Sequence, residues 1–211
     1  MSSISIIGVG NMARALGARA LDGGNTVEII GRDAAKAAAL ADALGGRAGT
    51  RAPDTAPDGD IVILAVPYAN TVPVVRQYGD RLAGKIIVDI SNPFAPDFSG
   101  LLTPEGSSAA QQIAAVAPAG ARVVKGFNTI FAHVLASDPE HRRRLDVFLA
   151  GDDAQAKQDV SSLVDSLALR PLDTGPLAMA GRLEQAGLLV MGVAHHGTRH
   201  FDFALGITVF D

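Results

Sequence analysis

The chain has 211 residues, a formal net charge of −4 and no cysteine, and 48% of its residues are hydrophobic. This size supports one sizeable core, or one domain with a small addition. The lack of cysteine excludes disulfides, thiolate metal sites and a cysteine nucleophile. The acidic balance argues against nucleic acid or an anionic membrane as partner, and the densest basic run, residues 141–144 (HRRR), is typical of a solvated surface.

Apolar runs typical of buried strands alternate along the chain with alanine-rich stretches typical of helices. In chain order, strands are predicted at residues 4–7, 27–30, 60–66, 86–90, 122–125 and 147–150. Helices are predicted at residues 11–21, 33–44, 107–116 and 154–167. This alternation predicts an α/β protein with a doubly wound parallel sheet of the Rossmann type.

The last part of the chain has a different character. Residues 169–176 carry two prolines and a glycine around a short strand, residues 182–194 read as an apolar helix, and residues 201–210 form an apolar tail that should pack on the rest. We therefore predict a Rossmann domain over residues 1–151 and a small C-terminal part over residues 152–211 that closes the site and contributes to a homodimer. The apolar run 186–194 is too short to span a bilayer, and no leader precedes the first strand, so a cytoplasmic protein without a membrane segment is expected.

A glycine loop, G-V-G-N-M-A at residues 8–13, lies directly between the first predicted strand and helix. This is the dinucleotide-binding pattern in the context that it requires. Gly8 allows the tight turn, Gly10 lets the backbone approach a pyrophosphate, and Ala13 lets the helix pack close to the strand. Glycine pairs also close many ordinary strand–helix turns, but this position favours a bound nucleotide.

The end of the second strand indicates which nucleotide is bound. NAD-binding folds place an acid there to accept a hydrogen bond from the adenosine 2′-hydroxyl. Here Gly31 removes the carboxylate, Arg32 supplies a charged fork suited to a 2′-phosphate, and Lys36 follows one helical turn later. Asp33 is expected to cap the helix instead of facing the ribose. Arg32 and Lys36 would be ordinary surface cations on the alternative view, but the missing acid favours NADP(H).

Three strand ends outline the rest of the predicted cleft, because open α/β sheets bind ligands beyond the carboxyl ends of their strands. The residues at these ends that we expect at the cofactor are Ala65, Val66, Pro67, Asn92 and Asn128. Each asparagine also fits simple turn chemistry. Together these residues predict a mostly apolar pocket with a few neutral hydrogen-bonding groups.

Acid–base and metal chemistry find little support in the sequence. His133 is the one candidate base near these loops, and the histidines lack the H-E-x-x-H spacing of a zinc site, so no metal is expected. Hydride transfer between two cofactor rings needs orientation and dryness more than a strong acid or base. The residues available suit that reaction.

Several segments together resemble the NADPH:coenzyme F420 oxidoreductases and the related oxidoreductase domain of the six-transmembrane ferric reductases. They are GVGNMARALG, GRDAAK, AVPYANT, DISNPF, KGFNTI and LRPLDTGPL, and they run along essentially the whole chain. The resemblance implies a Rossmann domain, a homodimer, and hydride transfer from NADPH to a flavin-like acceptor. It also implies that Gly31, Arg32 and Lys36 hold the 2′-phosphate, that Val9, Gly10, Asn11 and Met12 line the pyrophosphate, and that Pro67, Asn92, Asn128 and Ile130 surround the rings.

Asn128 is a departure from the deazaflavin-reducing members, which carry histidine at this position. The segment KGFNTI, residues 125–130, is more similar to the ferric-reductase branch. The leading hypothesis is therefore an NADP-dependent oxidoreductase that acts on a small-molecule acceptor, the deazaflavin coenzyme F420. Reduction of FMN or FAD, and through them of ferric iron, is the second hypothesis, and a nucleotide-binding module without turnover is the third.

Overall fold

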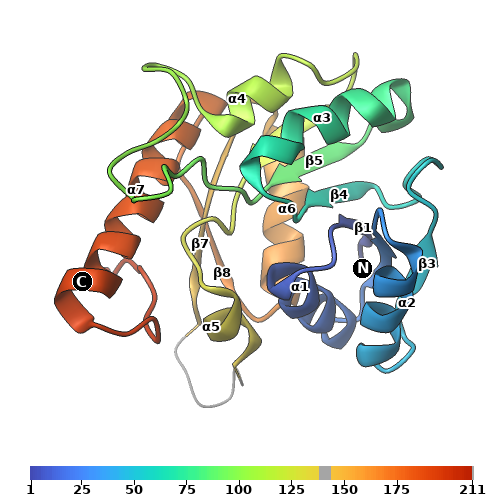
Figure 1. Ribbon diagram of the computed structural model, residues 1–211, viewed down its shortest axis with the longest axis horizontal. Helices are drawn as coiled ribbons and strands as arrows, with labels where there is room; N and C mark the ends of the chain where they lie inside the picture. Colours follow the sequence, from blue (N-terminus) through green and yellow to red (C-terminus); the bar gives the residue numbers. More distant parts are fainter. Residues whose placement is uncertain (138–143, 211) are drawn as a thin grey trace.

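The computed structural model describes residues 1–137 and 144–210 of the chain. Within them, eight strands form one sheet in the order β3-β2-β1-β4-β5-β6-β7-β8, with helices on both faces (Figure 1). The strands are β1 (Ser3–Ile7), β2 (Thr26–Ile30), β3 (Gly49–Arg51), β4 (Ile61–Leu64), β5 (Ile86–Asp89), β6 (Arg122–Lys125), β7 (Asp146–Gly151) and β8 (Arg170–Asp173). The helices are α1 (Asn11–Asp22), α2 (Ala34–Ala43), α3 (Tyr68–Tyr78), α4 (Ala109–Ala114), α5 (Ala132–Ala136), α6 (Ala154–Ser166) and α7 (Ala180–Gly192). This confirms the predicted Rossmann-type α/β fold.

The direction of the last two strands differs from the prediction of a parallel sheet. β1 to β6 pair in parallel, β7 pairs antiparallel with β6, and β8 is parallel to β7. A strand buried on both faces has the same apolar pattern whichever way it runs. The direction of β7 and β8 was therefore not readable from the sequence.

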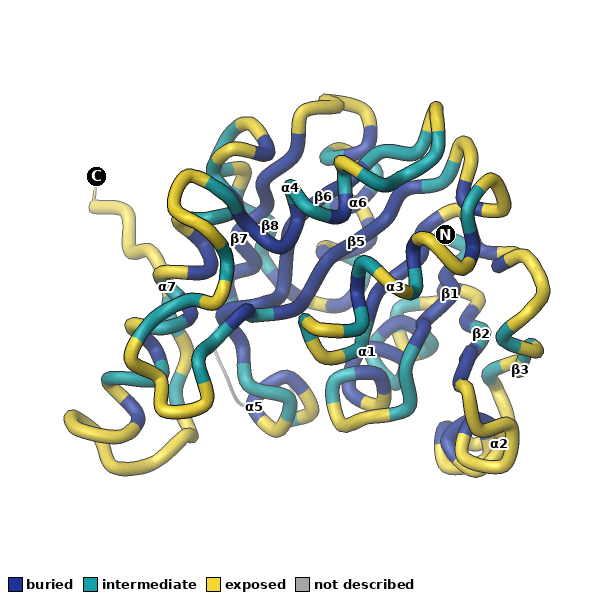
Figure 2. Tube along the Cα trace, turned by 45° about the horizontal axis from the view of Figure 1, so that its top comes forward, coloured by how far each residue is buried: buried dark blue, intermediate teal, exposed yellow. Residues whose placement is uncertain are grey.

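Two apolar layers hold the helices on the sheet. On one face, α1, α2, α5 and α6 insert Leu16, Leu40, Val134 and Leu163, all at most 5% exposed. On the other face, α3, α4 and the start of α7 pack against the sheet through a second apolar cluster. The strands accordingly run through the buried interior, with the loops exposed around them (Figure 2). Burial on both faces is what a doubly wound sheet requires.

Helix starts agree with the capping residues in the sequence. The side chains of Asp33, Ser108 and Asp153 each accept a hydrogen bond from a backbone N–H three residues later. Each thereby satisfies an N–H that the helix leaves free. Helix α3 was missed because Pro67 was interpreted as fixing a loop after the strand; Pro73 lies inside the helix, where its ring removes one backbone hydrogen bond.

Helix α7 continues through a 3₁₀ turn (Leu177–Met179) before it and a π-helical turn (Val193–Thr198) after it. The whole helical stretch, Leu177–Thr198, is 22 residues long and has the length and hydropathy of a membrane span. The apolar run 186–194, which was judged too short to span a bilayer, is therefore only part of a longer helix. Glu184 within it is fully buried in ionic contacts with the sheet, and Leu189 on another side is 62% exposed. A helix tied to the sheet in this way fits a component of the fold. The helix predicted over residues 182–194 is present, and the structure leaves Leu189 exposed on one side of it.

The C-terminal tail is held at Ile207 and exposed beyond it. The Ile207 N–H donates to Asp146 Oδ2 at 2.6 Å, and the Arg170 guanidinium donates to the Ile207 carbonyl at 2.5 Å. Val209 is 75% exposed and Phe210 is 87% exposed. The tail is thus anchored at Ile207, but most of its residues are exposed, so the expectation that it packs on the rest holds only in part.

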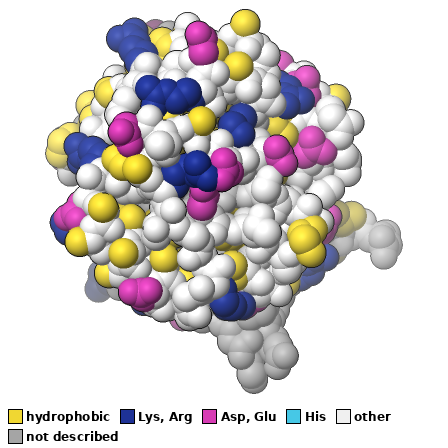
Figure 3. Space-filling view, turned by 90° about the vertical axis from the view of Figure 1, so that its right-hand side faces the viewer, with side chains coloured by type: hydrophobic (Ala, Val, Ile, Leu, Met, Phe, Trp, Pro, Cys, Tyr) yellow, Lys and Arg dark blue, Asp and Glu magenta, His cyan; other side chains and the backbone are white. Residues whose placement is uncertain are grey.

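The domain boundary predicted after residue 151 stays a prediction. Helix α6 and strand β8, which follow it, belong to the same layers and the same sheet as the residues before it. Most of the basic run 141–144 lies outside the described residues, and Arg144 pairs with Asp165 at 2.8 Å. On the side of the molecule that carries α2 and β3, basic and acidic side chains are interspersed (Figure 3).

Candidate functional site

The glycine loop makes a tight turn between β1 and α1. The Gly8 N–H donates to the Ile30 carbonyl at 2.9 Å, and the Gly8 φ angle is +138°. A Cβ at Gly8 would lie 2.1 Å from the Ala65 carbonyl oxygen, whereas a Cβ at Gly10 would meet nothing within 4 Å. Gly8 is therefore required by the fold itself, and Gly10 leaves open space that a ligand can enter.

Helix α1 begins at this open space. Gly10 occupies its N-cap, no side chain among the described residues caps it, and its first turn carries no acid. The free N–H groups and the positive end of the helix dipole suit an anionic group such as a pyrophosphate. Asn11 and Met12 form the start of this first turn, although neither is among the residues that line the neighbouring cavity.

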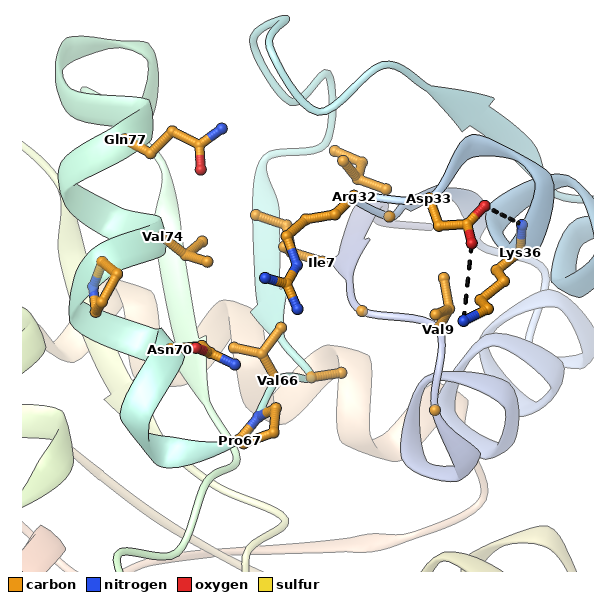
Figure 4. Close-up of a pocket in the computed structure, with 16 residues that line it drawn as sticks. Ile7, Val9, Arg32, Asp33, Lys36, Val66, Pro67, Asn70, Val74 and Gln77 are labelled. Carbon is orange, nitrogen blue, oxygen red and sulfur yellow. Dashed lines mark hydrogen bonds and ion pairs between the residues drawn. The ribbon is translucent and has the colours of Figure 1, made fainter.

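The end of β2 supplies the cations. Arg32 is exposed and its guanidinium reaches into the cavity, while Asp33 turns toward α2 (Figure 4). Asp33 Oδ1 accepts a hydrogen bond from the Lys36 backbone N–H at 3.2 Å, as a helix cap should, and Asp33 Oδ2 lies 3.7 Å from Lys36 Nζ. A Cβ on Gly31 would lie 2.8 Å from Val9 Cγ1. Any acid at residue 31 would thus have to displace Val9.

These residues line one cavity of about 640 Å³ at the carboxyl ends of β1, β2 and β4. β1 lies between β2 and β4, where the strand order reverses, which is the usual ligand position in this fold. Of the predicted cofactor residues, the structure brings together Gly8, Val9, Gly10, Gly31, Arg32, Lys36, Ala65, Val66 and Pro67.

Helix α3 forms the opposite wall of this cavity, which was not predicted. Asn70, Val74 and Gln77 face it from successive turns (Figure 4). Their spacing of four and three residues is the signal of one helical face. The signal was present in the sequence, but the stretch after Pro67 was interpreted as a loop.

Asn92 and Asn128 lie beside the ends of β5 and β6, outside the residues that line this cavity. The Asn128 side-chain amide donates to Asn92 Oδ1 at 3.0 Å and to the Leu183 carbonyl of α7 at 2.8 Å. The Asn92 amide donates to the Asn128 carbonyl at 2.7 Å. The two asparagines therefore form a fixed amide pair that is anchored to α7.

Ile130 and His133 face different surroundings. Ile130 is 6% exposed and packs in the apolar core. His133 is exposed on α5, with its ring 5.8 Å from that of Phe131. Their predicted roles at the rings stay predictions. Within residues 1–137 and 144–210, no three His, Asp or Glu side chains are grouped as metal ligands.

Comparison with known proteins identifies relatives of this chain. Residues 3–93 match the model of the family described as "NADP oxidoreductase coenzyme F420-dependent". The chain is 31% identical to metalloreductase STEAP3 of Rattus norvegicus over 188 residues, which are 89% of this chain and 37% of that protein. It is 30% identical to the F420-dependent NADP reductase of Methanocaldococcus jannaschii over 141 residues, which are 64% of this chain and 62% of that protein.

A solved structure extends the similarity along the chain. The crystal structure of a putative F420-dependent NADP reductase from an Arthrobacter species superposes with a TM-score of 0.85 at 25% identity, covering 99% of this chain and 100% of that one. The chain spans 37% and 62% of the two curated relatives above. Both relatives are named as reductases, and the matching model describes NADP oxidoreductases, so the predicted resemblance is confirmed.

Proposed function

We propose that the chain, whose residues 3–93 match the model of the coenzyme F420-dependent NADP oxidoreductases, transfers a hydride between NADP(H) and a deazaflavin. The observation that carries this proposal is the cavity of about 640 Å³, in which the glycine loop, Gly31 after the end of β2 and the Arg32 guanidinium meet. These are the parts that a nucleotide with a 2′-phosphate needs.

Each part of the cavity has a distinct role in binding. Gly10 and the N-terminus of α1 receive the pyrophosphate, where backbone N–H groups and the helix dipole favour negative charge. Arg32 binds the 2′-phosphate with its charged fork, and Lys36 adds a second cation whose charge is partly shared with Asp33. Pro67 lines the same cavity at the end of β4 and is the residue that we place beside the nicotinamide.

The second half of the reaction is the transfer of a hydride from the nicotinamide to the acceptor. A hydride moves to the carbon at position 5 of the deazaflavin, and a proton from solvent completes the reduced ring. This reaction asks the protein for orientation and exclusion of water, and the hydrogen-bonded Asn92–Asn128 pair gives the strand ends a fixed geometry for it. The F420-dependent NADP reductase at 30% identity supports coenzyme F420 as the acceptor.

A flavin or ferric reductase is the second candidate, and a specific observation favours it. The relative that matches the larger part of this chain, 89%, is a metalloreductase. FMN or FAD would occupy the same position as the deazaflavin, and ferric iron would be reduced through it. Asn128 in place of histidine adds weight to this candidate.

Steady-state kinetics with purified protein and NADPH test the proposal. We expect kcat/KM to be highest with coenzyme F420, lower with FMN and FAD, and lowest with a ferric chelate. A higher value with flavin, or with flavin plus a ferric chelate, would replace the first candidate with the second. NADPH binding without turnover on any acceptor would indicate a nucleotide-binding module.

We also infer a cytoplasmic homodimer. Its support is the apolar surface that α7, the π-helical turn and the tail leave exposed, with Leu189 at 62%, Val193 at 38% and Ile207 at 48% exposure. Exposed apolar surface of this kind usually marks an interface.

A further inference from the structure

Three charged side chains meet in the interior below the Asn92–Asn128 pair. Lys125 ends β6, Asp89 ends β5 and Glu184 lies on α7, and all three are 0% exposed. Lys125 Nζ is 2.8 Å from Asp89 Oδ2 and 2.9 Å from Glu184 Oε1. One ammonium group thus faces two carboxyl groups in a place that water does not reach.

The hydrogen bonds show which of these groups are ionised. Lys125 uses all three of its N–H donors, because its third goes to the Ser91 carbonyl at 2.6 Å. Asp89 has both oxygens satisfied, because Oδ1 accepts the Ser91 N–H at 2.9 Å. The Lys125 and Asp89 side chains therefore have no unsatisfied polar atom, and as a cation and an anion their charges cancel.

Glu184 is satisfied on one side only. Its Oε1 accepts from Lys125 and from the Ala109 backbone N–H at 3.0 Å, while Oε2 is buried without a hydrogen-bond partner. A bare carboxylate oxygen in a dry interior is costly, and an ionised Glu184 would leave the cluster with a net charge of −1. A proton on Oε2 neutralises this carboxyl group and brings the net charge of the cluster to zero.

Two acceptors on neighbouring residues are also left without a donor. They are Ser91 Oγ and Asn128 Oδ1, both buried. Ser91 binds Lys125 through its carbonyl, and Asn128 binds the carbonyl of Leu183, the residue before Glu184. Three of the four such atoms in the described residues therefore lie in this one network.

Several titratable side chains lie on α7 and on the elements packed against it. Arg182 on α7 and His195 and His196 on the π-helical turn are exposed, and Arg122 of β6 donates to the Gly84 carbonyl. β5 and β6 bring Asp89 and Lys125, while α4 and the turn Leu177–Met179 have no charged side chain. β7 brings Asp146, which is paired with Arg170. Burial raises the pKa of Glu184 above its ordinary 4.5, Lys125 opposes the shift, and the Asp89 charge adds to it.

Helix α7 is the element that the cluster holds in place. Leu183 binds the Asn128 amide through its carbonyl, and a Cβ on Gly187 would lie 2.9 Å from Asn92 Oδ1. The residues on either side of Glu184 thus touch the amide pair, and Glu184 is their ionic connection to the sheet. A displacement of α7 would move both asparagines.

We propose that Glu184 is a positioning residue: as a neutral carboxylic acid it completes the Asp89–Lys125 pair and seats α7 against Asn92 and Asn128 at the acceptor end of the site. The assignment of the acceptor end rests on the proposed function. The protonation state and the seating of α7 do not, and they are measured without substrate.

Infrared difference spectroscopy between the wild type and Glu184→Gln tests the proton. We expect the wild type to show the carbonyl band of a buried carboxylic acid near neutral pH, and Glu184→Gln to lack it. The exposed Glu105, exchanged in Glu105→Gln, is the matched control that leaves the band unchanged. A wild type without this band overturns the proposal, whatever the enzyme's acceptor is.

Thermal unfolding as a function of pH gives a second measure. A carboxyl group with a raised pKa binds more protons in the folded than in the unfolded state, so stability falls as pH rises from 4.5 through the raised pKa. We expect this fall in the wild type and its loss in Glu184→Gln, which mimics the neutral acid. Destabilisation of Glu184→Gln at neutral pH would show that the ionised form is the one required.

Kinetics separate positioning from general stability. We expect Glu184→Ala to lower kcat with the best acceptor by on the order of 10²-fold, as for a misplaced reaction geometry, and to leave the NADPH affinity unchanged. Glu184→Gln should restore kcat to near the wild-type value. An equal loss in both variants, or a loss of NADPH affinity instead of kcat, would contradict the role. If Glu184→Ala does not fold, the comparison of wild type with Glu184→Gln decides.

Discussion

Replacement of Arg32 by alanine should weaken NADPH binding much more than NADH binding. The guanidinium reaches into the cavity at the end of β2, where Gly31 stands in place of an acid, and we propose that it binds the 2′-phosphate there (Figure 4). A charge-assisted hydrogen bond contributes about 1.5–3 kcal/mol. Because Arg32 is exposed, water screens it and the lower end of that range applies, which corresponds to about ten-fold in affinity.

Calorimetric titration of wild type and Arg32→Ala with NADPH and with NADH measures this difference. Arg47→Ala is the matched control, because Arg47 is an exposed arginine that pairs with Asp22 at 2.9 Å and does not line the cavity. Lys36→Ala should have a smaller effect than Arg32→Ala, since Lys36 already faces Asp33 at 3.7 Å. Unchanged NADPH affinity in Arg32→Ala, or an equal loss for NADH, would refute the assignment of the 2′-phosphate site.

Three further predictions follow from positions in the fold. Gly10→Ala should keep the thermal stability of the wild type but lose NADPH affinity. Gly8→Ala should lose about 2–4 kcal/mol of unfolding free energy, because its Cβ would collide with the Ala65 carbonyl. Equal denaturation midpoints for the two variants would contradict this. His133→Ala should change kcat by less than about 3-fold, since loss of a true base costs roughly 10²–10⁴-fold, and a loss of that size would show acid–base catalysis. Light scattering at micromolar concentration should give the mass of two chains, and a single-chain mass would show that the exposed apolar surface of α7 and the tail has another purpose.

Much of the fold was predictable because buried strands and capped helices leave strong local patterns. The apolar runs placed all the central strands, and Asp33 marked the start of α2. β3 was missed because only three mostly exposed residues form it, and such a strand has no apolar run. α3 was missed because one proline outweighed a regular helical face. The apolar composition of α7 did not reveal that Leu189 is exposed, since a core helix and an interface helix have similar sequences.

The candidate site was predictable where one local motif defines it, and not where distant elements meet. The glycine loop and the pair Gly31–Arg32 were readable, because their chemistry is local. The contact of Glu184 with Lys125 joins residues 59 positions apart, and no periodicity reports it. One signal was available: Asp89 and Lys125 are charged residues that end apolar strands, and a charge at such a position needs a buried partner.

Transfer of a labelled hydride tests the central claim most directly. NADPH that carries deuterium at nicotinamide C4 would be mixed with the purified protein and coenzyme F420, and the reduced product analysed by mass spectrometry and by the rate of its formation. The account predicts that the deuterium appears on the reduced deazaflavin and that the label slows the transfer step. Reduction of coenzyme F420 without deuterium in the product, or no reduction at all while FMN or FAD is reduced, would contradict direct hydride transfer between NADPH and the deazaflavin.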